Sequence, residues 1–256
     1  MVTALSQDEF ASVILCGGRG TRMGELTAGL PKPLLEVHGK PIIGHVLDAL
    51  LKNQITSFIF PLGFKGSEIA DFVKKNYSSR AKLFFIDTGS DSEIKKRIDL
   101  ARPCLSRFED ILLVNSDTIF DFNIPEMFKK HIRDCNLVTL CSVDITSPWG
   151  LINQSLDGTL VSFERDRKVG LFKTHFDDSV NSLINSGITW FKTRSLDNID
   201  MKNQKDFETD LFNDAIERGR AGVYKMNGFW YPIDTPKDLH AINYSDLSSF
   251  RINSEG

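Results

Sequence analysis

The residues with the clearest chemical potential are a glycine cluster and two cations in the first 35 positions. The glycines are Gly17, Gly18 and Gly20. Because glycine has no Cβ, the backbone there can adopt positive φ, approach a ligand closely and point successive N–H groups at phosphate oxygens. Arg22 and Lys32, the latter between two prolines, add positive charge to the same segment. This combination predicts a site for a nucleoside triphosphate.

Two common nucleotide-binding motifs do not fit this segment. The dinucleotide fingerprint requires G-x-G-x-x-G, and Met23 stands where the third glycine would be. The P-loop ends in Gly-Lys-Ser or Gly-Lys-Thr, and neither occurs in the chain. What remains is Gly-Gly-x-Gly-Thr-Arg, followed by Leu26-Thr27 and Pro31-Lys32-Pro33.

Two aspartates could form a metal site beside this loop. Asp117 follows an apolar strand expected at 111–115, so it should lie at the carboxyl edge of a parallel sheet. Asp234 precedes Thr235-Pro236, which predicts the start of a helix. Magnesium is commonly held by one or two carboxylates together with substrate phosphates. We therefore expect both aspartates to bind Mg²⁺, although each, taken alone, is also typical of a turn or helix cap.

Together, these motifs resemble the signature of the sugar-1-phosphate nucleotidyltransferases, over about residues 12–243. The resemblance implies that a nucleoside triphosphate and a sugar 1-phosphate react to give a nucleotide sugar and pyrophosphate, with Mg²⁺. The substrate-binding residues that match in the first segment are Leu15, Gly17, Gly18, Gly20 and Thr21, and a further one is expected at Gly89. The implied catalytic residues are Arg22, Lys32 and Asp117, and the implied metal ligands are Asp117 and Asp234.

The resemblance assigns the acceptor side of the site to a later part of the chain. The matching residues are Gly150, Glu164, Arg165 and Asn185. Three positions depart from the family pattern: Ser116 replaces glycine, Arg165-Asp166 replaces Lys-Pro, and Ser186 replaces glycine or alanine. Arg165 is expected to hold the acceptor phosphate, with Lys168 as the alternative. Two of these departures lie in the half of the chain that is expected to bind the acceptor. An unusual sugar phosphate and a non-sugar phosphate are therefore kept as alternative acceptors.

The nucleobase is less well specified. Purine and thymidylyl members often carry Pro-Leu-Gly-Thr-Gly/Ala-Gly before the third helix, whereas this chain has Asp-Thr-Gly-Ser-Asp-Ser-Glu at 87–93. With Gly63-Phe64-Lys65-Gly66 and Gly228-Phe229-Trp230, it is more similar to the glucose-1-phosphate cytidylyltransferases, which favours CTP. Because the Thr-Gly-Gly-Arg motif that is usual in those enzymes is absent, guanylyl transfer to mannose 1-phosphate or heptose 1-phosphate is the second candidate activity. A non-catalytic nucleotide-binding relative is a further alternative.

The elements that must position these residues follow from the hydrophobic pattern. Strands are expected at 12–16, 57–62, 82–86, 111–115 and 137–143, and helices at 41–53, 67–76, 93–101 and 125–134. This alternation predicts an α/β fold with a Rossmann-like, doubly wound, mixed but mostly parallel sheet, the nucleotidyltransferase fold. Further strands are expected at 149–153, 160–164, 170–176, 183–191, 223–226 and 229–232, and helices at 207–218 and 236–243. The short strands predict a small β-rich portion that binds the sugar.

Composition limits the remaining possibilities. The chain has 256 residues and a net charge of −3, which suits one domain over 1–256, with a core at about 11–243 and a frayed tail at 244–256. The near-neutral charge provides no basic face for nucleic acid, and no apolar run approaches the roughly 20 residues of a membrane span. The first ten residues do not resemble a secretory signal, and four cysteines without a C-x-x-C pair favour a reduced, cytoplasmic setting. A homo-oligomer is possible.

Overall fold

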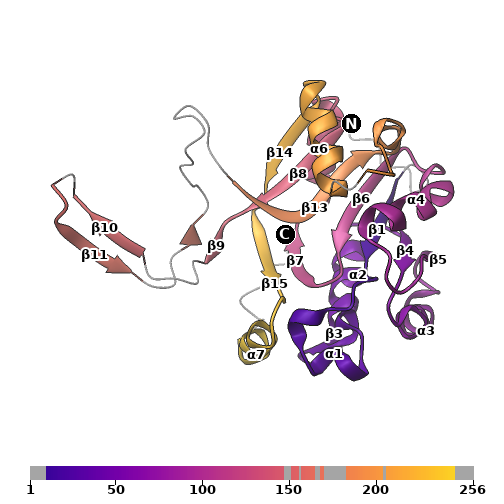
Figure 1. Cartoon of the computed structure of the whole chain (residues 1–256), viewed down its shortest axis with the longest axis horizontal. Helices are drawn as coiled ribbons and strands as arrows, with labels where there is room; N and C mark the ends of the chain where they lie inside the picture. Colours follow the sequence, from indigo (N-terminus) through magenta and orange to yellow (C-terminus); the bar gives the residue numbers. More distant parts are fainter. Residues whose placement is uncertain are drawn as a thin grey trace.

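The centre of the molecule is a seven-stranded sheet, drawn in Figure 1 from the computed structural model. The structure describes residues 10–146, 151–155, 157–164, 168–169, 183–203 and 206–245, with only the backbone at 146, 151–153, 164 and 168–169. In sheet order the strands are β14 (Ala221–Lys225), β8 (Val138–Val143), β13 (Ile184–Lys192), β6 (Asp110–Asn115), β1 (Phe10–Leu15), β4 (Ser57–Leu62) and β5 (Lys82–Asp87). Only β13 runs antiparallel to its neighbours within this sheet. The α/β fold with a mostly parallel sheet is therefore confirmed.

Helices cover both faces of the sheet, because its strands are apolar on both sides. The longer helices are α2 (Ile42–Lys52), α3 (Gly66–Tyr77), α4 (Ile94–Leu105), α5 (Ile124–Arg133), α6 (Phe207–Glu217) and α7 (Pro236–Tyr244). Along β6, Leu112 and Val114 pack in the cluster with α2, α3 and α5, whereas Ile111 and Leu113 pack with α4 and α6. This alternation is what a buried parallel strand requires, and it makes the sheet doubly wound.

Helix α4 is longer than the predicted 93–101. It continues past Pro103 to Leu105, although an internal proline removes a backbone hydrogen bond and crowds the preceding turn. Ala101 and Leu105 are both fully buried against the sheet. Burial of this apolar face thus outweighs the cost of the proline.

A two-stranded ladder that the sequence did not predict in full lies beside the main sheet. Strand β7 (Thr118–Phe122) follows Asp117 directly and pairs antiparallel with β15 (Gly228–Pro232), with Thr118 opposite Pro232. Of this pair only β15 was expected. Figure 1 shows β15 leading from the sheet towards α7. Helix α7 contacts β2 (Glu36–Val37), which pairs with β3 (Lys40–Pro41) after the short helix α1 (Leu26–Gly29).

The β-rich portion is described in part. Strands β10 (Leu151–Gln154) and β11 (Leu160–Glu164) form a hairpin that stands apart from the main sheet at the left of Figure 1. Strand β9 (Ile145–Thr146) pairs with β12 (Lys168–Val169). The strand expected at 170–176 lies outside the described residues. Within the described ranges, no helix has the length and hydrophobicity to span a membrane.

Candidate active site

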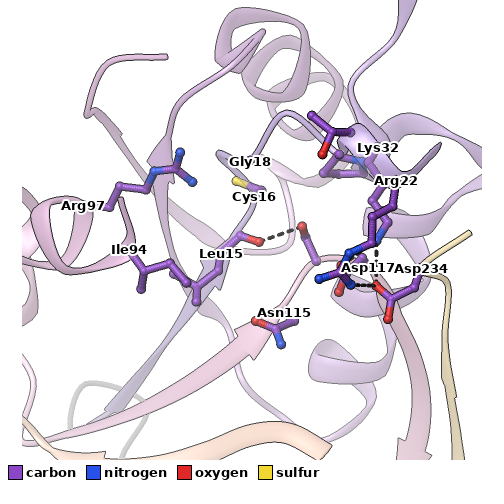
Figure 2. Close-up of a pocket in the computed structure, with 14 residues that line it drawn as sticks. Leu15, Cys16, Gly18, Arg22, Lys32, Ile94, Arg97, Asn115, Asp117 and Asp234 are labelled. Atoms are coloured by element: carbon purple, nitrogen blue, oxygen red, sulfur yellow. Dashed lines mark hydrogen bonds and ion pairs between the residues drawn. The ribbon is translucent and has the colours of Figure 1, made fainter. Parts of the chain in front are cut away.

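The glycine loop and both aspartates meet in one cavity of about 410 Å³ at the carboxyl edge of the sheet. Figure 2 shows the residues that line it. The predicted residues among them are Leu15, Gly18, Gly20, Thr21, Arg22, Lys32, Asp117 and Asp234. They meet because β1 and β6 lie side by side, with Leu15 opposite Asn115, so the loops after both strands emerge together.

Gly20 gives the loop its shape. It has a φ of +64°, which disfavours other residues, and it precedes a short 3-10 helix, Thr21–Met23. A Cβ at this position would also lie 3.0 Å from the Cβ of Lys32. The hydroxyl of Thr27 donates to the carbonyl oxygens of Gly20 and Gly24, at 3.2 and 3.1 Å. Thr27 of the motif therefore stabilises the turn that presents Arg22 to the cavity.

Lys32 lies between the two aspartates. Its side chain is 11% exposed, and its Nζ donates to Asp117 Oδ2 at 2.7 Å and to Asp234 Oδ1 at 3.3 Å. The guanidinium of Arg22, largely exposed, has its Nη1 3.6 Å from Asp234 Oδ1. Two carboxylates from distant parts of the chain thus converge on one cationic group.

This convergence suits a divalent cation that is shared with phosphate. In the part of the chain that the structure describes, no three His, Cys, Asp or Glu side chains form a metal cage. Asp117 and Asp234 can therefore supply two oxygen ligands or more, and a ligand or water must supply the rest. Mg²⁺ is usually held in this way, by one or two carboxylates and the oxygens of a bound phosphate. The side chains present fit the ion.

Backbone hydrogen bonds fix the positions of the two aspartates relative to each other. The amide N–H of Ile233 donates to the carbonyl oxygen of Asp117 at 2.9 Å, continuing the ladder of β7 and β15. Beyond it, Asp238 Oδ2 accepts from the N–H groups of Asp234 and Thr235, at 3.1 and 2.8 Å. Thr235 and Asp238 form a capping box at the start of α7. The helix cap therefore also positions the second aspartate.

Ser116, which departs from the family pattern, has a structural explanation. Its hydroxyl donates to the carbonyl oxygen of Leu15 at 2.7 Å, and its amide N–H points to the same oxygen at 3.3 Å. The side chain therefore links the ends of β1 and β6. The dashed line at the Leu15 carbonyl oxygen in Figure 2 marks this hydrogen bond. The substitution leaves the carboxylate of Asp117 directed into the cavity.

Six lining residues were not predicted from the sequence as catalytic, substrate-binding or metal-binding residues. They are Cys16, Pro33, Ile94, Arg97, Asn115 and Ser116. Burial raises the pKa of the Cys16 thiol to about 12, so this cysteine stays protonated near neutral pH and supplies no nucleophile. For Arg97 a signal did exist, because it lies within an apolar stripe that includes Ile94, Ile98 and Ala101. An arginine on the buried face of a helix needs a partner.

The remaining predicted residues stay predictions. Gly17 adjoins the cavity, whereas Gly89 bonds back to Asp87 Oδ1 through its N–H at 3.0 Å and does not line it. Asn185 is exposed, and its Oδ1 accepts from the N–H of Gly187 at 3.1 Å. Gly150 and Arg165 lie outside the described residues, and Glu164 and Lys168 are described by their backbone in β11 and β12.

Comparisons with known proteins agree with this geometry. The profile of the family described as "Nucleotidyl transferase" matches residues 11–249. A probable glucose-1-phosphate cytidylyltransferase of Bacillus subtilis is 29% identical over 252 residues, covering 91% of this chain and 94% of that protein. The mannose-1-phosphate guanyltransferase beta-B of Xenopus laevis is 29% identical over 237 residues, covering 89% and 62%. The chain spans about half (53%) of the bifunctional protein GlmU of Methanococcus maripaludis, at 26% identity and 91% coverage of this chain.

Solved structures share the fold at lower identity. A putative glucose-1-phosphate thymidylyltransferase from Bacillus anthracis superposes with a TM-score of 0.67 at 19% identity, covering 91% of this chain and 94% of that one. HddC from Yersinia pseudotuberculosis, complexed with GMP-PN, gives a TM-score of 0.65 at 19% identity, covering 91% and 97%.

Proposed function

The chain belongs to the nucleotidyl transferase family and is a nucleotidyltransferase, and we propose that it joins CTP to a sugar 1-phosphate, releasing pyrophosphate. The observation that carries this proposal is the convergence of Lys32, Asp117 and Asp234 beside the glycine loop. The cytidylyltransferase name of the Bacillus subtilis relative supports CTP. The four cysteines of the chain are free, which supports a reduced, cytoplasmic setting.

The geometry supports direct in-line transfer. An oxygen of the acceptor phosphate attacks the α-phosphorus, and the bond from that phosphorus to the bridging oxygen breaks as pyrophosphate leaves. Such a step requires positioning and charge neutralisation rather than a covalent nucleophile. A general base is unnecessary, since a phosphate monoester is already largely ionised near neutral pH.

The side chains divide this work between them. Lys32 stabilises the charge that develops on the α-phosphate, and Arg22, exposed at the cavity mouth, contacts the leaving pyrophosphate. The backbone N–H groups of the glycine loop orient the triphosphate. Asp117 and Asp234 would hold Mg²⁺, which, when bound, neutralises phosphate charge.

A second candidate is guanylyl transfer to mannose or heptose 1-phosphate. It is supported by the Xenopus laevis relative, whose identity to this chain equals that of the Bacillus subtilis protein. The two candidates share the cavity and the reaction and differ only in base and acceptor.

Pyrophosphate release tests the proposal. The purified protein is incubated with Mg²⁺, each of CTP, GTP, UTP, dTTP and ATP, and glucose, mannose or heptose 1-phosphate. We expect Asp117→Asn and Lys32→Ala to lower turnover at least roughly 100-fold, as loss of charge stabilisation at a reacting phosphate should. Lys52→Ala and Asp121→Asn, at an ion pair outside the cavity, are the matched controls and should keep wild-type turnover. Near-normal turnover in the two site variants, with folding verified by circular dichroism, would contradict the assignment.

A further inference from the structure

A second cavity, of about 440 Å³, lies at the edge of the sheet opposite the active site. Its lining includes Leu137, just before β8, and Arg220, just before β14. It also includes Arg194, just after β13, which runs antiparallel to both β6 and β8. The active site adjoins the carboxyl ends of β1 and β6, whereas this cavity adjoins the amino ends of β8 and β14. The two cavities share no lining residue.

Three arginines line this second cavity, which we call the arginine cavity: Arg194, Arg218 and Arg220. Among the described residues its only acidic lining residue is Asp197, and this carboxylate pairs with a fourth arginine, Arg102, at 3.1 Å. Arg218 donates from Nε to Asp214 Oδ1 at 2.9 Å. The cluster therefore sets four guanidinium groups against two carboxylates, a net charge of +2 in a chain whose net charge is −3. Such a local excess of positive charge favours an anionic ligand.

Two of the three arginines have no carboxylate partner in the part of the chain that the structure describes. Arg220 donates instead to the carbonyl oxygen of Cys135, from Nε at 2.7 Å and also from Nη2. These two bonds hold its guanidinium in one orientation. The side chain of Arg194 is exposed and has no hydrogen bond or ion pair with any described residue. Both side chains can therefore bind an anion without first breaking an ion pair.

The fold fixes the backbone that carries these arginines. Gly219, with a φ of +62°, follows the end of α6 and directly precedes Arg220. The carbonyl oxygen of Arg220 accepts from the N–H of Leu137 at 2.7 Å. Beside Arg194 in sequence, the hydroxyl of Thr193 donates to the carbonyl oxygen of Phe108 at 2.8 Å. Because the backbone is ordered before a ligand arrives, binding carries a smaller entropic cost.

We propose that the arginine cavity binds the phosphate group of a small molecule, as a second ligand site remote from the reaction. The planar guanidinium presents paired N–H donors that match two phosphate oxygens, which gives charge-assisted, bidentate contacts. With about 440 Å³, the cavity is close in size to the active-site cavity of about 410 Å³. It therefore has room for a phosphorylated metabolite as well as for the free phosphate ion.

Isothermal titration calorimetry without Mg²⁺ tests this site. Inorganic phosphate, pyrophosphate and glucose 1-phosphate are titrated into the wild type, Arg194→Gln and Arg220→Gln. We expect the wild type to bind and each variant to raise the Kd roughly 10- to 100-fold, as loss of a hydrogen bond to a charged group should. Arg133→Gln removes the same charge at a surface pair with Asp134 and should bind like the wild type. Lys32→Ala, in the active site, should keep the binding that the two arginine variants lose.

The order of the three compounds identifies the ligand. Tighter binding of glucose 1-phosphate than of inorganic phosphate would identify a phosphorylated metabolite, and the reverse order would identify the free ion; both results support the site. Where Arg220→Gln does not fold, Arg220→Lys keeps the charge, loses the planar fork and should still raise the Kd.

Three results would overturn the inference. The first is a wild type that binds none of the compounds at millimolar concentration. The second is a loss of all binding in Lys32→Ala, which would assign the anion to the active site. The third is an equal rise of the Kd in Arg133→Gln and Arg194→Gln, which would show only a general effect of charge. None of these measurements uses turnover, so they are independent of the proposed function.

Discussion

At the scale of single residues, Lys32 has two roles in one position. In the protein alone its ammonium lies between Asp117 and Asp234, which neutralises two carboxylates that would otherwise repel each other. With a triphosphate bound, the same ammonium can contact phosphate while the carboxylates bind the ion. The flanking Pro31 and Pro33 restrict the backbone on either side of it. The site is therefore organised before its ligands arrive.

His45 gives a prediction that depends on pH. Burial lowers the pKa of this imidazole below its ordinary value of 6.5, only partly opposed by the Val37 carbonyl oxygen, 2.9 Å from Nε2, and by Asp48, while Lys40 adds to the lowering. The folded protein thus favours the neutral form. Its contribution to the free energy of unfolding is complete above the unfolded pKa and is lost as the pH falls towards the folded pKa.

Urea unfolding at about pH 7.5 and about pH 5.5 measures this contribution. We expect His45→Gln to lose less stability between the two pH values than the wild type does. His240→Gln, at an exposed histidine of α7, is the control and should behave like the wild type. An equal loss in His45→Gln and the wild type would exclude the effect.

At the scale of elements, the β7–β15 ladder and the start of α7 bring the metal ligands together. The ladder places Thr118 opposite Pro232; Asp117 directly precedes Thr118, and Asp234 lies two residues after Pro232. The cap of α7 then holds the backbone of Asp234. Stability and metal binding are therefore linked through one side chain, Asp238.

Asp238→Ala tests this link. Because it removes an acceptor for two backbone N–H groups at a helix start, we expect the free energy of unfolding to fall by about 1 kcal/mol. We also expect a higher Mg²⁺ concentration at half-maximal activity, since Asp234 is held less firmly. Lys237→Ala, an exposed change in the same helix turn, is the control. An unchanged Mg²⁺ dependence in Asp238→Ala would separate the cap from the metal site.

At the scale of the whole molecule, the central sheet contains strands from the first and second halves of the sequence side by side. Strand β13 lies between β6 and β8, and β14 forms the edge beside β8. Trp230, on β15, donates through its Nε1 to the carbonyl oxygen of Ser186 at 3.0 Å. Separating the early strands from the late ones would therefore break the hydrogen bonds between neighbouring strands of the central sheet. This arrangement supports a single folding unit.

We expect one cooperative unfolding transition. Far-UV circular dichroism reports all elements, whereas tryptophan fluorescence includes Trp190, buried at the centre of the sheet. The two midpoints should coincide in the wild type and in Trp230→Phe, where the signal of β15 is removed. Separate transitions in either protein would show that the chain contains more than one folding unit.

Several features of the fold and of the site could be predicted from local sequence. The apolar runs located β1, β4 and β6, because strands buried on both faces are continuously apolar. The glycine loop, Lys32 and both aspartates were recognised because each has a local signature. Strand β7 was missed, since its five residues, Thr-Ile-Phe-Asp-Phe, do not alternate strictly between apolar and polar types and directly follow a metal-site turn. Arg97 was missed although it lies within the apolar stripe of its helix, because the stripe does not show which group the buried charge faces.

By itself the sequence determined which chemical groups are available: a loop whose glycines permit positive φ, a lysine between prolines and two aspartates at the ends of apolar segments. Only the tertiary structure decided that these groups share one cavity. Lys32 and Asp234 are 202 positions apart, and their contact depends on the register of β7 against β15. Strand register is set by packing between distant segments, which no local pattern encodes. The same reason applies to Arg97, whose place beneath Gly17 follows from how α4 packs on the sheet.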